Sequence, residues 1–321
     1  MDRLPLMPIT MMFAADQIGV PYRAYVTDYR VLAEAQIATA ERYDLDYVSA
    51  ISDPAREAFD CGASVTFFED QPPAIDEANA LLADKGRLSS LRAPNPRESQ
   101  RMGDRLLAVG LLKREAGDRR LVEGWIEGPC AQAADLRGIN NLMLDFYDDP
   151  PFVEELLEFV VAMEVEFARA QIDNGADSIG VGDAASSLVG PAIYERFIWP
   201  RQLRMVDAVR SMGAVVRLHI CGDTRPLLSG MGRLGCEIVD LDYPAPMEMG
   251  RRAMGEAQVL LGNIDPVRVL LQGTPESVRK ELEACWLQAG PRYIVGAGCE
   301  VARGTPDANM RAMTEFARSH P

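Results

Sequence analysis

The sequence has few histidines, a deficit of cationic side chains and no long apolar run. Only His219 and His320 occur in 321 residues, which excludes mechanisms that need several histidines. Lys and Arg total 33 against 48 Asp and Glu, so the formal net charge is −15. This balance argues against binding to nucleic-acid phosphates or to an anionic membrane surface. No segment reaches the roughly 18 consecutive apolar residues of a membrane span, so no membrane segment is expected.

The sequence also lacks the dense cysteine content of a disulfide scaffold. The six cysteines are Cys61, Cys130, Cys221, Cys236, Cys285 and Cys299. Disulfide frameworks are typical of short secreted chains. The apolar start LPLMPITMMFAA is interrupted by Pro5 and Pro8. We expect this start to be a strand or loop leading into the fold and not a secretion signal. The thiols are therefore expected to be reduced, in a cytoplasmic protein.

Short apolar runs alternate with longer helical patterns along the chain. The strand candidates are DYVSAIS, LVEGWIEG, DSIGVGD, AVVRLHIC, EIVDLD, VLLGNID and RYIVGAG. Nearly continuous apolar strands are expected where both faces of a sheet are covered. Seven strands in this order predict a parallel sheet with helical crossovers in one domain, residues 1–321. A (β/α)8 TIM-type barrel is the leading interpretation and an open doubly wound sheet the alternative. No eighth strand can be placed from the pattern.

Helical periodicity is clearest over residues 150–174, where Pro150 and Pro151 set the start and Gly175 the end. Further helices are predicted over residues 31–43, 73–83, 191–212 and 274–288. Residues 1–43 form an N-terminal lead-in. Residues 65–68 are expected to form an extra strand after the first barrel strand. Residues 69–119 are predicted as a less regular insertion that covers the barrel mouth.

Polar residues follow nearly every predicted strand. They are Asp53, Glu127, Asp183, His219, Cys221, Asp242, Asp265 and Cys299. The carboxyl ends of barrel strands face a shared active-site mouth, so these side chains are candidates for one site. The alternative is that the aspartates begin loops and cap helices.

The pattern His-x-Cys at the end of one strand stands 78 positions before a cysteine at the end of the last. His219 and Cys221 are two residues apart and therefore share one face of a strand. Together with Cys299 they supply one imidazole and two thiolates, a ligand set that suits catalytic zinc with an open fourth position. The alternative is ordinary packing, because free cysteine and single histidines are common in protein cores.

Several segments carry a family pattern: ERYDLDYVSAISDPAREAFDCGASVTFFED, GWIEGP, NGADSIGVGDAASS, GCEIVDLDYP, LLGNIDP and GAGCE. In these segments the chain resembles the uroporphyrinogen decarboxylase superfamily, which implies a (β/α)8 barrel. One branch consists of decarboxylases that use an aspartate after the first barrel strand and need no metal, and Asp53 matches that position. The arginine-rich N-terminal motif of that branch is missing, because Leu4 to Val20 contain no arginine. The last strand also departs from the decarboxylase pattern, because it ends in GAGCE where decarboxylases carry Gly-His-Gly.

The resemblance to the second branch, methylcobamide-dependent methyltransferases, is carried by His219, Cys221 and Cys299, which match its zinc ligands. It implies transfer of a methyl group from a methylcobamide, carried by a corrinoid-binding partner, to a thiol such as coenzyme M. Tetrahydrofolate is an alternative acceptor; porphyrinogen decarboxylation and a non-catalytic corrinoid- or tetrapyrrole-binding role are alternative functions. The remaining candidate residues are Asp53 in catalysis, and Asp183, Asp242, Asn263 and Asp265 as contacts to substrate or corrinoid.

Overall fold

The computed structural model describes residues 3–320, and its centre is a curled sheet of seven parallel strands. The order in the sheet follows the chain, β1-β4-β5-β6-β7-β8-β9. The strands are β1 (Tyr47–Ser49), β4 (Leu121–Glu127), β5 (Ser178–Gly182), β6 (Val215–Ile220), β7 (Ile238–Leu241), β8 (Val259–Leu261) and β9 (Tyr293–Ile294). All seven predicted strands are confirmed. Nearly every residue of these strands is buried, which explains why the segments are apolar with little alternation between apolar and polar residues.

The N-terminal segment lies between the two outer strands of this sheet. Leu6 forms a parallel bridge with Val295, directly after β9. On its other side, the carbonyl of Leu6 accepts a hydrogen bond from the backbone N–H of Asp46, directly before β1 (3.0 Å). Pro5 cannot donate a backbone hydrogen bond, so this short segment has no strand-like sequence pattern. The sequence therefore predicts only an N-terminal lead-in here, and not a segment that joins the two outer strands.

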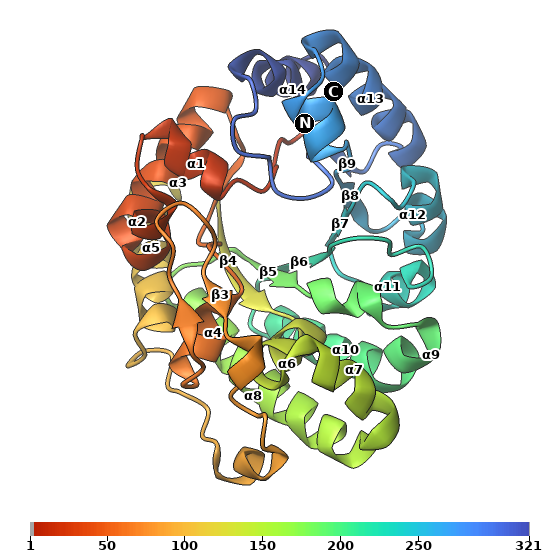
Figure 1. Cartoon of the computed structure of the whole chain (residues 1–321). Helices are drawn as coiled ribbons and strands as arrows, with labels where there is room; N and C mark the ends of the chain where they lie inside the picture. Colours follow the sequence, from red (N-terminus) through yellow and green to blue (C-terminus); the bar gives the residue numbers. More distant parts are fainter. Residues whose placement is uncertain (1–2, 321) are drawn as a thin grey trace.

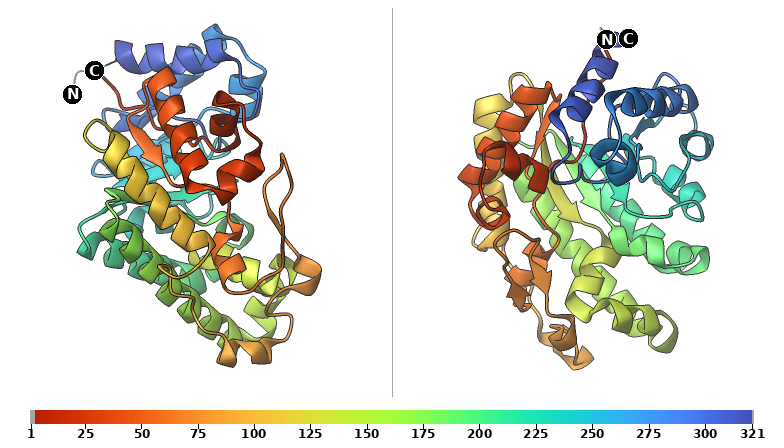
Figure 2. Two further views of the ribbon diagram at one scale, coloured as in Figure 1. Left: turned by 90° about the vertical axis from the view of Figure 1, so that its left-hand side faces the viewer. Right: turned by 45° about the horizontal axis from the view of Figure 1, so that its top comes forward.

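Helices cover the outside of the curled sheet, as Figure 1 shows. The larger ones are α3 (Tyr29–Tyr43), α5 (Arg101–Ala116), α8 (Pro150–Asp173), α10 (Trp199–Ser211), α13 (Pro275–Ala289) and α14 (Asp307–Ser319). The shorter ones are α1 (Met12–Gln17), α2 (Tyr22–Thr27), α4 (Ala55–Asp60), α6 (Pro129–Arg137), α7 (Ile139–Asp148), α9 (Pro191–Ile193), α11 (Leu228–Leu234) and α12 (Met247–Met254). Leu4 donates its backbone N–H to the carbonyl of Ala317, so the two ends of the chain meet, as both views of Figure 2 show.

The predicted helices over residues 31–43, 150–174 and 274–288 are confirmed as α3, α8 and α13. The helix predicted over residues 191–212 is present up to Ser211, but a π-helical turn, η4 (Tyr194–Ile198), separates α9 from α10. Pro200 lacks the N–H that an α-helix would bond to the carbonyl of Arg196, which accounts for the wider turn. A second π-helical turn, η5 (Pro266–Leu271), follows β8.

The predicted helix over residues 73–83 is wrong. This segment holds β3 (Ala74–Ile75), which pairs antiparallel with β2 (Val65–Thr66), and the 3-10 turn η1 (Glu77–Asn79). Hydrogen bonding to β2 outweighs a weak helical pattern that begins at Pro73. The strand expected over residues 65–68 is present as β2, outside the main sheet.

The segment between α4 and α5, coloured orange in Figure 2, extends beyond the ring of helices. It contains the β2–β3 hairpin, η1 and the 3-10 helix η2 (Lys85–Ser90). The expectation of irregular structure fails at its end, because α5 is a regular helix of 16 residues. Leu112, Val109 and Ala108 of α5 are fully buried in the main core, which gives this helix the same supporting position as its neighbours.

The 3-10 turn η3 (Ala184–Leu188) follows β5 at the edge of the sheet where its polar residues gather. No helix within residues 3–320 combines the length and the apolar character that crossing a bilayer requires.

Candidate active site

The imidazole of His219 and the thiols of Cys221 and Cys299 converge at one point. His219 is on β6, Cys221 follows it directly, and Cys299 lies in the loop after β9. The Nε2 atom of His219 lies 3.0 Å from the Sγ atom of Cys221, which lies 3.6 Å from the Sγ atom of Cys299. The ligand atoms of all three residues lie within 4.8 Å of one another. Residues separated by 78 positions in the chain thus form one cluster that suits a metal ion.

A buried ionic network orients the ring of His219. Its Nδ1 atom faces Asp240, with the backbone carbonyl at 3.3 Å and the carboxylate Oδ2 at 3.4 Å. Arg217 binds the same carboxylate oxygen through Nη2 (2.6 Å) and reaches Glu123 at 3.3 Å. These side chains are at most 4% exposed. Because Nδ1 is engaged with Asp240, Nε2 is the ring atom that faces the two thiols.

The two thiols differ in acidity. The hydrogen bond from Cys221, together with the adjacent His219, lowers the pKa of Cys299 to about 4 against the opposing effect of burial. The same hydrogen bond, together with burial, raises the pKa of Cys221. Burial opposes protonation of His219, but the charges of Cys221 and Asp240 outweigh it and raise the pKa of the imidazole. The shared hydrogen bond therefore favours the thiolate form at Cys299 over that at Cys221.

The cluster lines a cavity of about 150 Å³ in the mouth of the sheet. One wall is apolar and consists of Ile9, Ile51 and Trp125, which pack together apart from the main core. The indole of Trp125 lies across β5, where a Cβ atom on Gly180 would stand 2.1 Å from its ring. The glycines of SIGVG therefore make room for the wall of the cavity.

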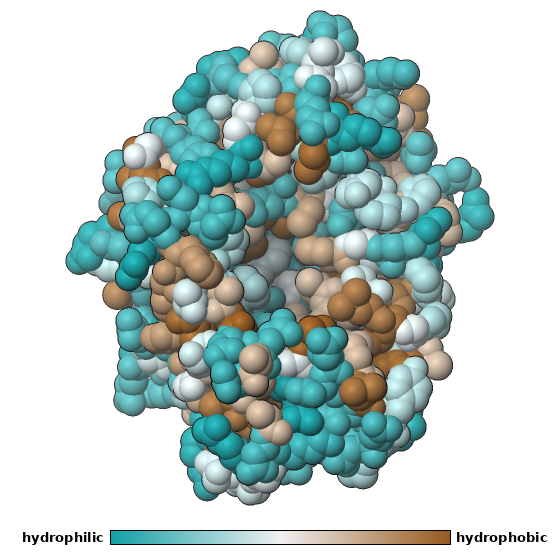
Figure 3. Space-filling model, viewed as in Figure 1, coloured by the Kyte–Doolittle hydropathy of each residue, from teal (hydrophilic) through white to brown (hydrophobic). Residues whose placement is uncertain are grey.

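A second cavity of about 580 Å³ adjoins the first. The two share Pro54, Glu127, Ala184 and Cys221 among their lining residues. The outer cavity is also lined by Pro73, Ile75 and Glu77 of the segment after α4. Figure 3 shows the molecule hollowed at the centre of the ring of helices. Cys221 thus lies at the boundary between a small inner cavity and a larger outer one.

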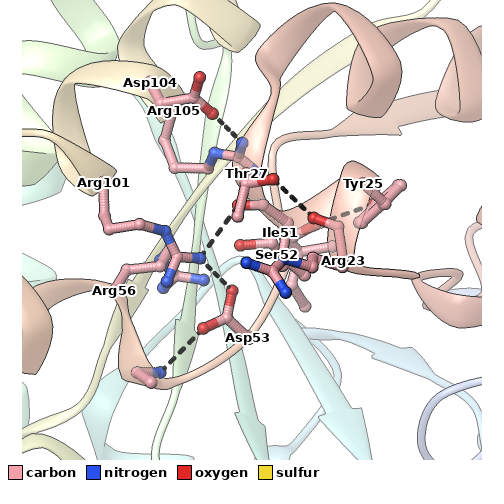
Figure 4. Close-up of polar contacts among 12 residues, drawn as sticks. Arg23, Tyr25, Thr27, Ile51, Ser52, Asp53, Arg56, Arg101, Asp104 and Arg105 are labelled. Atoms are coloured by element: carbon pink, nitrogen blue, oxygen red, sulfur yellow. Dashed lines mark hydrogen bonds and ion pairs between the residues drawn. The ribbon is translucent and has the colours of Figure 1, made fainter. Parts of the chain in front are cut away.

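Two predicted aspartates line the inner cavity, and both have partners. The Asp53 carboxylate faces the guanidinium of Arg101 at 2.6 Å (Figure 4). Asp183 accepts hydrogen bonds from the backbone of Ala131 (2.7 Å) and from the side chains of Ser186 (2.8 Å) and Gln202 (2.7 Å). Burial raises the pKa of Asp183 to about 6 although these bonds oppose the rise.

Glu127 lines both cavities, whereas Asp242, Asn263 and Asp265 line neither. Asp242 accepts the backbone N–H of Gly222 at 2.6 Å and so supports the loop that carries Cys221. Asn263 donates to the carbonyls of Asp242 (3.1 Å) and Ala245 (2.6 Å). Asp265 caps η5 by accepting the N–H groups of Val267 and Arg268, both at 2.8 Å. Asp265 therefore serves as a helix cap, and it does not line the cavities at the mouth, where the sequence predicted it.

Sequence reasoning missed the charged residues inside the sheet and on α4. Arg217, Glu123 and Asp240 are buried in the middle of strands, where apolar side chains are the norm. Arg56 is 0% exposed and pairs with Glu57 (3.0 Å) and Glu127 (3.2 Å). The available signal was a charged residue at an inward position of an otherwise apolar strand, as in VVRLHIC and EIVDLD. Such a residue needs a buried partner.

Comparisons with known proteins agree with this geometry. The family model described as uroporphyrinogen decarboxylase (URO-D) matches residues 1–320. Methylcobamide:CoM methyltransferase MtbA of Methanosarcina mazei is 30% identical over 266 residues, which cover 82% of this chain and 76% of that protein. A uroporphyrinogen decarboxylase of Prochlorococcus marinus is 30% identical over 220 residues, which cover 66% of this chain and 62% of that protein.

Among solved structures, a methyltransferase from Methanosarcina mazei superposes with a TM-score of 0.90 at 22% identity. The match covers 99% of this chain and 94% of that one, so the two proteins share the fold. The family match over nearly the whole sequence, together with this fold, shows that the chain belongs to the uroporphyrinogen decarboxylase family.

Proposed function

We propose that this protein is a zinc-dependent methyltransferase that moves a methyl group from a protein-bound methylcobamide to a thiol such as coenzyme M. The observation that carries the proposal is the convergence of His219, Cys221 and Cys299 on one small cavity. The similarity to methylcobamide:CoM methyltransferase MtbA supports it. A cytoplasmic location fits reduced thiols at this position.

The donor set fits zinc. One imidazole and two thiols are the ligand types that zinc prefers, and three protein ligands leave a position for a substrate. The Nε2 atom of His219 faces the thiols, while Nδ1 faces Asp240 in the manner of a ligand held by a carboxylate. When bound, zinc supplies a Lewis acid that favours the thiolate form of an acceptor thiol at neutral pH.

The chain itself binds, orients and shields the reactants. In the reaction, the acceptor sulfur forms a bond to the methyl carbon and the cobalt–carbon bond breaks. Its electron pair stays on the cobalt, which passes from Co(III) to Co(I), and the thiol proton is released. The apolar wall of Ile9, Ile51 and Trp125 excludes water from the attacking sulfur. Asp53 and Asp183 are the proposed contacts to substrate, whereas Asp242 supports the loop that carries Cys221 and Asn263 supports the loop after β7.

The methyl donor is proposed to arrive on a corrinoid-binding protein that docks over the outer cavity. Pro73, Ile75 and Glu77 belong to the segment after α4 and line this cavity. We therefore propose this segment as the docking surface. It is also the proposed insertion that follows β1. We propose that the fold is a (β/α)8 barrel in which the segment around Leu6 occupies the position of the eighth strand.

Metal analysis of the purified protein tests the proposal. We expect about one zinc per chain, lost in Cys299→Ser and retained in Cys61→Ser. Cys61 is a matched control because it is a partly buried thiol whose Sγ atom lies 3.4 Å from the sulfur of Met163, and it is not one of the three clustered ligands. Protein that stays free of zinc when prepared without chelators contradicts the proposal. The transfer itself is tested by mixing the protein with methylcobalamin and a thiol and following the demethylation of methylcobalamin by absorbance.

Porphyrinogen decarboxylation is the second candidate, because Asp53 lines the inner cavity and decarboxylases are among the similar proteins. It leaves the His219, Cys221 and Cys299 cluster without a role. Asp53 is also engaged by Arg101 in a buried ion pair. Loss of carboxylates from uroporphyrinogen in a metal-free preparation, with no thiol methylation, is the outcome that favours it.

A further inference from the structure

Glu127 is an acid at the junction of the two cavities. It is the last residue of β4 and lines both the inner and the outer cavity. In the register of the sheet it pairs with Gly182, which in turn pairs with His219. Glu127 and His219 therefore lie at the same level of the sheet, with a residue that has no side chain between them. The carboxyl group of Glu127 thus faces the cavity of the metal cluster without belonging to the cluster.

One oxygen of this carboxyl group is free. The Oε1 atom of Glu127 accepts a hydrogen bond from Nη2 of Arg56 at 3.2 Å, and the same Nη2 atom donates to Glu57 at 3.0 Å. The other oxygen, Oε2, accepts no hydrogen bond from the residues that the structure describes. Glu127 is 6% exposed, and Oε2 is not enclosed like the unpartnered oxygens of Glu164, so it faces the cavities.

The other acids of the inner cavity are engaged elsewhere. Asp53 is held in a buried ion pair, and both oxygens of Asp183 accept hydrogen bonds. Glu300 accepts the backbone N–H of Met12 at 2.7 Å and does not reach the outer cavity. Glu127 is therefore the acid that combines a free oxygen with a position on both cavities.

Three more acids lie behind Glu127, around the same guanidinium of Arg56. They come from α4, α6 and α8 and are Glu57, Asp135 and Glu164. Both oxygens of Glu164, Oε2 of Glu57 and Oδ2 of Asp135 are buried without a hydrogen-bond partner among the described residues. Burial raises the pKa of Asp135 and of Glu164 well above the usual range, and the charges of the neighbouring acids add to the rise. Four carboxyl groups beside one guanidinium cannot all be ionised, so this cluster holds protons at neutral pH.

This crowding gives Glu127 an unusual acidity. Burial raises the pKa of its carboxyl group to about 8 against the opposing charge of Arg56. The charges of Glu57, Asp183 and Asp53 add to the rise. A free thiol has a pKa of about 8.5, so a proton passes between a thiol and Glu127 with little change in free energy. An ordinary glutamate, with a pKa of about 4.3, would bind the same proton roughly 10⁴-fold more weakly.

We propose that Glu127 is the general base that removes the proton of the acceptor thiol in the inner cavity. The inference rests on the proposed function and adds a catalytic residue to it. The S–H bond breaks, its electron pair stays on the sulfur, and the proton moves to Oε2 of Glu127. Because Glu127 also lines the outer cavity, it then releases the proton to solvent on that side. Glu57, Asp135 and Glu164 act through Glu127 as positioning residues, since they match its proton affinity to that of a thiol.

The rate of thiolate binding tests the proposal without any methyl donor. Cobalt(II) in place of zinc makes a bound thiolate visible by absorbance, and stopped-flow mixing gives the rate. The probes are mercaptoethanol and the more acidic trifluoroethanethiol, which are similar in size and uncharged as thiols. At pH 8, Glu127→Gln should slow the binding of mercaptoethanol by about 10²- to 10⁴-fold, the usual contribution of a general base. It should hardly slow trifluoroethanethiol, because that thiol already ionises in solution.

The pH profile and a conservative variant give two further readouts. In the wild type, the rate for mercaptoethanol should level off above about pH 8, where Glu127 is mostly ionised. In Glu127→Gln it should keep rising with the fraction of thiolate in solution. Glu127→Asp retains a carboxyl group and should restore part of the rate.

Asp46→Asn is the matched control. Burial raises the pKa of Asp46 as well, but its carboxylate pairs with Arg3 at 2.8 Å and lines neither cavity. Its substitution should change stability without changing the rate for either thiol. A folded Glu127→Gln protein that binds both thiols at wild-type rates overturns the proposal. If Glu127→Gln does not fold, the wild type decides, and a rate for mercaptoethanol that follows the thiolate fraction up to pH 10 without levelling off has the same consequence.

These measurements separate the inference from the proposed function. If the cobalt-loaded protein binds no thiolate and the zinc-loaded protein methylates no thiol, the proposed function fails and this inference fails with it. If thiols bind and are methylated at rates that do not depend on Glu127, the general base fails and the proposed function stands.

Discussion

Replacement of Asp240 by Asn should weaken zinc binding while the protein stays folded. Asp240 is 1% exposed, and its Oδ2 atom lies 3.4 Å from Nδ1 of His219 and 2.6 Å from Nη2 of Arg217. Asn keeps the shape and one acceptor but removes the charge that faces the ligand histidine. Loss of such a supporting carboxylate typically costs 10- to 100-fold in metal affinity, which is about 1.4–2.8 kcal/mol.

Competition with a chromogenic zinc chelator measures this affinity, and thermal unfolding of the metal-free protein measures stability separately. Some loss of stability is also expected, because Arg217 would keep only Glu123 as a full counter-charge. Glu237→Gln is the control. It removes one carboxylate that pairs with Arg210 at the start of β7, remote from the imidazole of His219. A folded Asp240→Asn protein with wild-type zinc affinity would refute the reasoning and assign the orientation of His219 to the backbone carbonyl of Asp240.

Three further outcomes are expected. Gly180→Ala should lower stability by about 1–3 kcal/mol and change tryptophan fluorescence, because its Cβ atom would lie 2.1 Å from the ring of Trp125; Gly190→Ala, with nothing within 4 Å, should behave as the wild type. Leu6→Ala should cost about 2–5 kcal/mol in chemical denaturation, because Leu6 is fully buried between the outer strands, and a cost below 1 kcal/mol would contradict this packing. Glu127→Gln should gain stability relative to the wild type as pH rises from 5 to 9. Burial raises the pKa of Glu127 in the folded state to about 8, so its favourable contribution is complete below the unfolded pKa and is lost as pH rises through 8. A difference in unfolding temperature that does not change with pH would contradict this last expectation.

Much of the fold follows from local pattern. Each predicted strand is a short apolar run that is covered on both faces, and each lies where the pattern placed it. The positions of His219 and Cys221 follow from the same regularity, since side chains two apart on a strand share a face. Where the pattern is weak, competing interactions decide. The hairpin of β2 and β3 replaces the helix expected at residues 73–83 because its stabilising contacts are with a neighbouring strand.

The sequence by itself determined the order of the seven strands, the parallel sheet and the three residues that form the candidate metal site. Only the tertiary structure decided what surrounds them, because ion pairs and cavities depend on residues far apart in the chain. The pairing of His219 with Asp240 is a matter of register between β6 and β7. The closing position of Leu6 depends on hydrogen bonds to both ends of the sheet. No sequence pattern singles out Arg56, and only the structure shows that it is buried and paired with Glu57 and Glu127.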